Sequence, residues 1–177
     1  MNSVALGNLC EVDWGNTNLT KSAYVTSGKY LAVSATGGDG RIDFAEHGGD
    51  VAVLSAIGAQ CGKMFYPGVE FTAIKNTITL TPRKSAAIGK YLYYLFTHIQ
   101  LPIRGAGQPF ISKGDIEKFE IPVTHSLPEQ KAIVEKLDAA FAEIDLMRDQ
   151  AMAAKSSFSA LRQSILSSAF TEVADVA

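Results

Sequence analysis

Two short motifs in the sequence combine residue types that could carry out chemistry. Gly58-Ala-Gln-Cys-Gly-Lys63 resembles a phosphate-binding loop, in which glycine N–H groups and a lysine cradle phosphate oxygens. It is one residue short of that motif and lacks the Ser or Thr that holds magnesium, so we interpret it as a glycine turn between two strands. Glu129-Gln-Lys131 has the Glu-x-Lys spacing of many nucleases, but Glu129 stands where a helix start needs a capping carboxylate. Neither motif predicts an active site.

The remaining reactive side chains are scattered. His47, His98 and His125 have no cysteine or carboxylate at metal-ligand spacing, so we predict no metal site. Cys10 and Cys61 form neither a zinc pair nor a disulfide framework, which favours a reducing cytoplasm. The sequence also lacks the Gly-rich loop and the Asn/Asp-Pro-Pro-aromatic signature expected of an adenine methyltransferase. We therefore expect a binding protein that is not an enzyme and has no cofactor of its own.

Side chains suited to contact DNA occur in the segments that we expect to be loops. Arg104 and Gln108 flank Gly105-Ala-Gly107, where two glycines leave the backbone free of bulk. Because arginine reads guanine through two hydrogen bonds and glutamine reads adenine, we predict that this pair contacts base edges. Four further loop cations are predicted phosphate contacts, the alternative being an ordinary solvated surface. They are Lys21, Arg41, Lys63 and Lys75.

Composition limits how such residues can act. A chain of 177 residues that is 47% hydrophobic can bury one good core. Its net charge of −2 gives no general attraction to nucleic acid, so any basic patch must be local. The longest apolar stretch, near residues 91–96, is far too short to span a bilayer, and we expect no membrane association.

Residues 1–125 are predicted to fold as one α+β domain that positions these loops. The expected strands are residues 30–34, 41–44, 51–56, 64–66 and 71–80, separated by glycine-rich turns such as residues 36–40. Many short strands of this kind favour a small curled or barrel-like sheet. Apolar residues at helical spacing predict a helix over 85–100. Ser112 is expected to cap a short helical turn before a strand over 119–123.

Residues 126–170 are predicted to form one long helix, followed by a frayed tail over 171–177. Ser126 and Glu129 match a capping box, with Pro128 in the first turn. Small or apolar residues then recur at alternating steps of four and three, which is typical of a coiled-coil seam. The seam residues are Ile133, Leu137, Ala140, Ile144, Met147, Ala151, Ala154, Phe158, Leu161 and Ile165.

The seam is complementary to itself in one direction only. If two copies pair antiparallel about a midpoint near residue 149, Phe158 meets Ala140. Parallel pairing stacks Phe158 on Phe158 and leaves voids at alanine layers, at a cost on the order of 1 kcal/mol for each missing methylene. Residues 129–149 carry six acidic and three basic side chains, whereas residues 150–170 carry two basic and no acidic ones. Antiparallel pairing thus also brings unlike charges together. We predict an antiparallel homodimer, with the helix of another protein as the alternative partner.

Several stretches, in this order along the chain, carry a family resemblance. They are Leu6–Val12, Gly49–Ser55, Gly105–Ile111, Ile121–Val123, Leu127–Leu137 and Leu161–Phe170. Together they resemble one half of a specificity subunit from a type I restriction–modification system. The resemblance implies a target recognition domain over 1–125, followed by a spacer helix, in a non-catalytic subunit that binds double-stranded DNA. The chain departs from the family pattern because it carries one recognition domain and one helix where two of each are usual.

The resemblance also implies partners. DNA methyltransferase (modification) subunits would bind the specificity subunit and supply S-adenosylmethionine, and a restriction subunit is a further candidate. With the predicted homodimer, two recognition domains would read a bipartite inverted repeat. The alternatives are a recognition-domain fragment of a larger single-chain methyltransferase or restriction enzyme, and a coiled-coil adaptor that does not bind DNA.

Overall fold

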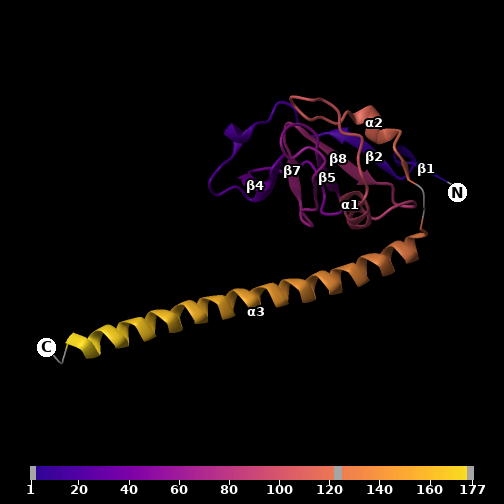
Figure 1. Ribbon diagram of the computed structural model, residues 1–177. Helices are drawn as coiled ribbons and strands as arrows, with labels where there is room; N and C mark the ends of the chain where they lie inside the picture. The colour runs from indigo at the N-terminus through magenta and orange to yellow at the C-terminus, as the bar shows by residue number, and fades with distance from the viewer. Residues whose placement is uncertain (1–2, 122–124, 175–177) are drawn as a thin grey trace. The chain divides into compact units, whose positions relative to one another are not determined.

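Three β-sheets lie in the part of the chain that the computed structural model describes, residues 3–121 and 125–174 (Figure 1). The largest is antiparallel and contains, in order, β2 (Cys10–Trp14), β8 (Thr77–Pro82), β5 (Ala52–Ser55) and β6 (Met64–Phe65). The second contains β4 (Gly37–Ile42), β3 (Tyr30–Ser34) and β7 (Phe71–Ala73), and the third pairs β1 (Val4–Ala5) with β9 (Glu120–Ile121). The α+β class is confirmed, and within the described residues the sheets stay open and do not close into a barrel.

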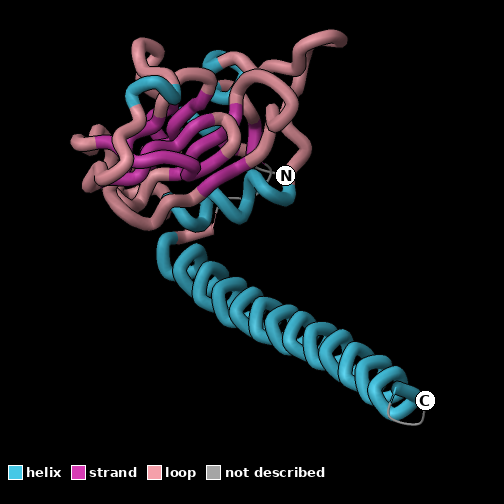
Figure 2. The backbone as a smooth tube through the Cα atoms, turned by 90° about the vertical axis from the view of Figure 1, so that its left-hand side faces the viewer, coloured by secondary structure: helices cyan, strands magenta, loops and turns pink. Residues whose placement is uncertain are grey.

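Helical segments accompany the sheets and extend beyond them. They are the 3-10 turns η1 (Leu6–Asn8) and η2 (Lys21–Ala23), the helices α1 (Gly89–His98) and α2 (Lys113–Glu117), and the long helix α3 (Leu127–Ala174). Helix α1 packs against β5, β6 and β8, beside the strands in Figure 2. By its internal contacts the chain divides into two units, Met1–Val134 and Glu135–Ala177, so the first turns of α3 belong to the first unit.

The core of the first unit is organised around β5, which is buried on both faces. Successive side chains of a strand point to opposite faces of the sheet, so Ala52 and Leu54 enter one apolar cluster and Val53 enters another. The larger cluster includes Leu80 of β8 and Leu92 of α1, both fully buried. This arrangement explains why the segment around β5 is a continuous apolar run, which is typical of a strand covered on both sides.

Several strand predictions are confirmed and others are wrong. Strand β3 has the predicted bounds, and β5 and β6 lie within theirs. Residues 71–80 form two strands, because Asn76 adopts a left-handed conformation (φ 71°) between β7 and β8. Residues 37–40 were expected to form a turn but belong to β4, in which Gly40 lets the ring of Tyr24 lie against the backbone. Strands β1 and β2 were not predicted at all, and β9 covers part of the expected strand over 119–123, of which residues 122–123 lie outside the described residues.

The cap predicted at Ser112 is confirmed, and at Ser126 the structure shows the Glu129 half of the predicted capping box. Ser112 accepts a hydrogen bond from the Asp115 N–H (3.1 Å) and so begins α2. At the start of α3, the Glu129 carboxylate accepts hydrogen bonds from the Ser126 N–H and hydroxyl, both at 2.7 Å. These bonds lower the pKa of Glu129. Helix α3 continues to Ala174, beyond the expected end at residue 170, whereas α1 is shorter than the predicted span of 85–100 because Ile88 is extended.

A buried glutamine holds the first turns of α3 to the domain. Gln130 is 2% exposed, and its Oε1 accepts a hydrogen bond from the Ile88 N–H at 3.0 Å. Its Nε2 donates to the carbonyl oxygens of Ala86 and His125, both at 2.9 Å. Ile133 packs against the larger apolar cluster just beyond it. The first turns of α3 are therefore fixed to the rest of the first unit.

Candidate DNA interface and helix surface

The predicted base-reading loop is a tight hairpin. The backbones of Arg104 and Phe110 exchange two hydrogen bonds of 2.9 Å, which close the loop between them. Gly105 has a φ of +88°, and a Cβ at this position would overlap the carbonyl oxygen of Gln108. The loop conformation thus requires glycine at 105, and it leaves Arg104 and Gln108 exposed at its two sides.

A second loop lies directly against the first. The Gly58 N–H donates to the carbonyl of Pro109 at 2.9 Å, and a Cβ on Gly62 would lie 3.0 Å from the side chain of Ile103. Gly58 and Gly62 have φ values of +99° and +90°, so the expected glycine turn between two strands is confirmed. We call residues 58–63 and 103–110 together the two-loop surface. It carries three of the predicted DNA contacts, Lys63, Arg104 and Gln108.

Arg104 is held from one side by an acidic residue that sequence reasoning did not connect with it. Its Nη2 donates to Asp115 Oδ1 at 2.6 Å. The Ser112 hydroxyl donates to the other carboxylate oxygen, Oδ2, at 2.7 Å. The side chain of Arg104 is 60% exposed, whereas that of Asp115 is 19% exposed. The guanidinium is therefore anchored at one nitrogen and open to solvent elsewhere.

Lys21 is a different case, because its charge is compensated within the domain. Its Nζ lies 2.5 Å from Asp39 Oδ2 and 3.0 Å from Thr36 Oγ1. Tyr24, Ser34 and Thr36 also donate to this carboxylate, at 2.7, 2.9 and 2.6 Å. Burial alone would raise the pKa of Asp39, but the hydrogen bonds, that of Lys21 foremost, hold it well below its usual range. Burial and Asp39 together raise the pKa of the Tyr24 hydroxyl.

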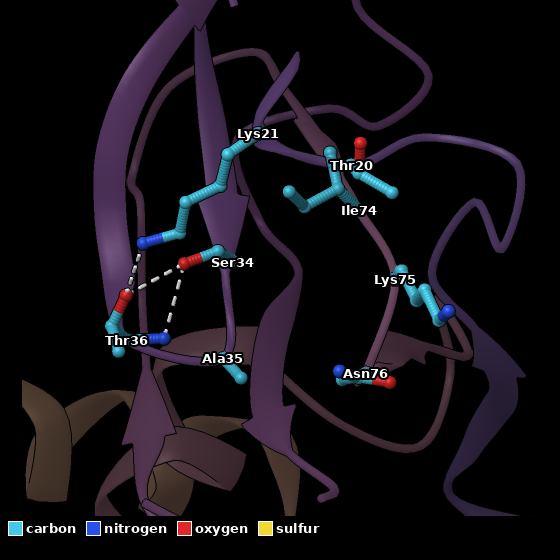
Figure 3. A pocket seen from close by; sticks show the side chains of 8 residues that line it. All are labelled: Thr20, Lys21, Ser34, Ala35, Thr36, Ile74, Lys75 and Asn76. Atoms are coloured by element: carbon cyan, nitrogen blue, oxygen red, sulfur yellow. Dashed lines mark hydrogen bonds between the residues drawn. The ribbon is translucent and has the colours of Figure 1, made fainter. Parts of the chain in front are cut away.

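This network borders a pocket of about 220 Å³ (Figure 3). Its lining residues are Thr20, Lys21, Ser34, Ala35, Thr36, Ile74, Lys75 and Asn76. Figure 3 shows Lys21 reaching toward Thr36, with Lys75 on the opposite side of the pocket. The two cations therefore do not converge on a common point, and we expect Lys75 to be the more available phosphate contact of the two.

The remaining predicted phosphate contacts are exposed. The Lys63 ammonium lies 5.7 Å from the centre of the Phe65 ring, a cation–π distance. Arg41 Nη1 donates to the carbonyl of Lys29 at 3.4 Å. Within the described residues there is no group of three or more His, Cys, Asp or Glu side chains placed to bind a metal ion.

The seam residues of α3 fall into two classes. Ile133 is partly buried against the core of its own domain. Further along, Ile144, Met147, Phe158, Leu161 and Ile165 are between 55% and 72% exposed. A shallow depression that is largely open to solvent lies beside Phe158, lined by Ala151, Ala154, Lys155, Ser159 and Arg162. No helix in the described part of the chain has both the length and the apolar character needed to cross a membrane.

Comparison with known proteins agrees with this architecture. Residues 1–154 match the family model described as type I restriction modification DNA specificity domain. A search of curated proteins gives no significant match. Three solved structures share the fold at 22–23% sequence identity.

The first is the type I restriction-modification S subunit from M. genitalium (TM-score 0.66, 22% identity, 78% of this chain and 38% of that chain). The second, from work on complex assembly and conformational transition of the type I R-M system, has a TM-score of 0.73 at 22% identity, covering 93% of this chain and 44% of that one. The third is the HsdS subunit from Thermoanaerobacter tengcongensis (TM-score 0.60, 23% identity, 83% and 38% covered).

The chain thus spans less than half the length of the solved chains that it matches. The family match covers most of the sequence. It confirms the resemblance to a type I specificity subunit that the sequence motifs indicated. It identifies a module for DNA recognition and not a catalytic subunit. The chain belongs to the family of type I restriction modification DNA specificity domains.

Proposed function

We propose that this protein is the DNA-recognition subunit of a type I restriction–modification complex and acts as an antiparallel homodimer. Each copy would contribute one target recognition domain, and together they would read two half-sites of an inverted repeat. The observation that carries the proposal is the exposed, self-complementary seam of α3.

The exposure of the seam supports a partner helix. Contiguous exposed apolar surface of this kind marks an interaction site. In the antiparallel register, Met147 of one copy faces Ala151 of the other, and Ile144 faces Ala154. Both alanines line the shallow depression beside Phe158, so the larger side chains of the second copy would pack into it. The packing preference and the charge asymmetry of the helix favour the same direction.

The symmetry of the proposed dimer would define its target. A second copy related by a two-fold axis would supply a second, equivalent recognition domain, and a two-fold protein requires an inverted-repeat target. The seam of residues 133–165 is about 48 Å long at 1.5 Å per residue, and it would set the spacer between half-sites.

The DNA contacts that we propose are those predicted from the sequence. Arg104 and Gln108 would contact bases, and Arg41, Lys63, Lys75 and Lys21 would contact phosphates. Modification subunits would bind this subunit and bring S-adenosylmethionine and the methyl-transfer chemistry, with a restriction subunit as an additional partner. Because the net charge is −2, the protein alone should bind DNA weakly, with its partners adding phosphate contacts.

Deletion of one heptad, residues 146–152, tests the proposal. It removes about 10 Å from the seam, or roughly three base pairs. In cells that contain the modification subunit, methylome sequencing should give the same two half-sites with a spacer shorter by about three base pairs. A wild-type motif without inverted symmetry, or a deletion that changes the half-site bases and not the spacing, would contradict the proposal.

A further inference from the structure

The contact between Arg104 and Asp115 can fix the orientation of a guanidinium that contacts a base. In the sequence, Arg104 precedes the hairpin loop and Asp115 follows it, eleven positions later. Arg104 Nη2 donates to Asp115 Oδ1 at 2.6 Å. A guanidinium is planar and carries five N–H donors in a fixed fork. When one N–H is fixed on a carboxylate, the plane of the fork and the direction of its remaining donors are fixed with it.

The carboxylate is itself rigidly placed. Ser112 donates to one oxygen of Asp115 at 2.7 Å and accepts from the Asp115 N–H at 3.1 Å. The next residue, Ile116, is fully buried and anchors α2 in the core. Lys113 of the same helix pairs with Asp13 of β2 at 2.7 Å. A side chain mounted in this way holds its partner more precisely than one carried by a loop.

The backbone of Arg104 is equally constrained, by two hydrogen bonds to Phe110 and by the turn at Gly105. Both ends of the arginine are thus fixed while the side chain stays 60% exposed. This arrangement suits a residue that must present its donors in one direction. A phosphate contact depends on the positive charge of the guanidinium, and an adjacent carboxylate would weaken that attraction.

We propose that Asp115 is a positioning residue that orients Arg104 to donate two hydrogen bonds to a guanine in the major groove of each half-site. This inference rests on the proposed function, because it assumes that Arg104 contacts a base. Asp115 does not touch DNA; it determines how strictly Arg104 distinguishes guanine from the other bases.

The test uses the full chain in complex with its modification subunit and a panel of duplexes with each half-site base pair replaced in turn. Arg104→Gln should lower discrimination at one G·C pair by about 10- to 100-fold. Asp115→Asn preserves the size of the side chain but removes its charge and replaces one of its two acceptor oxygens with an amide donor. It should relax discrimination severalfold at that same pair while leaving affinity for unrelated DNA unchanged. The double variant Arg104→Gln/Asp115→Asn should discriminate as well as Arg104→Gln alone. Asp115 acts through Arg104, so its substitution adds no further loss.

Asp13→Asn is the matched control. It removes the ion pair between Asp13 and Lys113 of the same helix, leaves Asp115 in place and should not change discrimination at any base pair. Thermal unfolding of all variants separates a loss of fold from a loss of specificity. Full discrimination in Asp115→Asn, with discrimination lost in Arg104→Gln, would overturn the role of Asp115.

Two other results would also overturn the inference. Tighter binding of Asp115→Asn to every duplex alike would mean that Arg104 contacts a phosphate. Unchanged base preference in Arg104→Gln would remove the base contact itself. In both cases an inverted, bipartite wild-type motif would leave the proposed homodimer intact, whereas failure of the proposed function would appear as a wild-type motif without that symmetry.

Discussion

At the scale of single residues, the structure separates side chains that hold the domain together from those that face outward. Gln130 and Glu129 lie in the motif that begins at Leu127, and both have complete structural roles. Glu129 caps α3, and Gln130 satisfies three backbone groups from inside the domain. The Glu-x-Lys spacing of Glu129 and Lys131 is therefore explained by helix initiation and requires no catalytic role.

Gln130→Met should destabilise the domain by about 2–4 kcal/mol. The substitution keeps the volume of the side chain but leaves the Ile88 N–H and two carbonyl oxygens without their buried partner. Urea unfolding followed by the fluorescence of Trp14, the single tryptophan, reports on the sheet that contains β2. Gln150→Met, on an exposed part of α3, is the control and should change stability by less than about 0.5 kcal/mol.

The network around Asp39 predicts a dependence of stability on pH. The pKa of Asp39 is lower in the folded protein than its ordinary value of 3.8. Its contribution to stability is therefore present above pH 4 and is lost as pH falls through the lowered folded pKa. The difference in unfolding free energy between wild type and Asp39→Asn should be larger at pH 6 than at pH 3.

Asp43→Asn serves as the control for this comparison, because Asp43 is exposed and follows directly after β4. It should change stability less than Asp39→Asn at pH 6. If the difference in unfolding free energy between wild type and Asp39→Asn is as large at pH 3 as at pH 6, this network is not a source of acid sensitivity.

At the scale of elements, one face of α3 has a buried part and an exposed part. Its first turns bind the domain through Gln130 and Ile133, and the same face continues as the exposed seam from Ala140 onward. The partly buried state of Ile133 means that the first predicted layer of the dimer lies against the recognition domain. In the proposed dimer, the layers that would depend entirely on a second copy are those between Ala140 and Phe158.

Substitutions at those two positions distinguish antiparallel from parallel pairing. Phe158→Ala should weaken the homodimer by at least about 100-fold, because it empties two symmetry-related layers. Ala140→Phe should also weaken it, by placing two phenylalanines in each of these layers. Mixing the two variants should restore association, since the heterodimer has one phenylalanine and one alanine in each layer. Sedimentation equilibrium measures all three states.

Met152→Ala is the matched control, because Met152 is 64% exposed on the same helix but lies off the seam. It should leave the dimer dissociation constant unchanged. A stronger dimer in Ala140→Phe would favour parallel pairing, in which that substitution fills a layer of two alanines.

At the scale of the whole molecule, the proposed dimer links DNA specificity to helix length. A heptad inserted after Asp149 should lengthen the spacer by about three base pairs, the counterpart of the heptad deletion. A two-residue insertion at the same point rotates the rest of the seam by about 200° and should abolish the dimer and the bipartite motif. Half-site base preference should be unaffected by the heptad insertion, because the recognition domain is unchanged.

The sequence predicted the parts of this protein that depend on local patterns. The long helix and its cap follow from residue spacing, and so do the cap at Ser112 and the glycine turn at residues 58–62. Pairing between distant segments was harder to predict. Strand β2 combines buried Cys10 and Val12 with acidic residues, and its partner β8 begins more than sixty residues later. The glycines of β4 resembled a turn because glycine is typical of turns, whereas the small size of Gly40 makes room for the ring of Tyr24.

The sequence by itself determined the α+β class, the long amphipathic helix and the loop that carries Arg104 and Gln108, because each depends on neighbouring residues. Only the tertiary structure decided that Asp115 holds Arg104 and that Gln130 holds the first turns of α3. It also decided that the two glycine loops lie together. These contacts join segments brought together by burial of a common core, and their partners have no periodic relation in the chain. The spacing of residues determined the helices and the glycine turns, and the packing of the core determined which strands pair and which side chains meet.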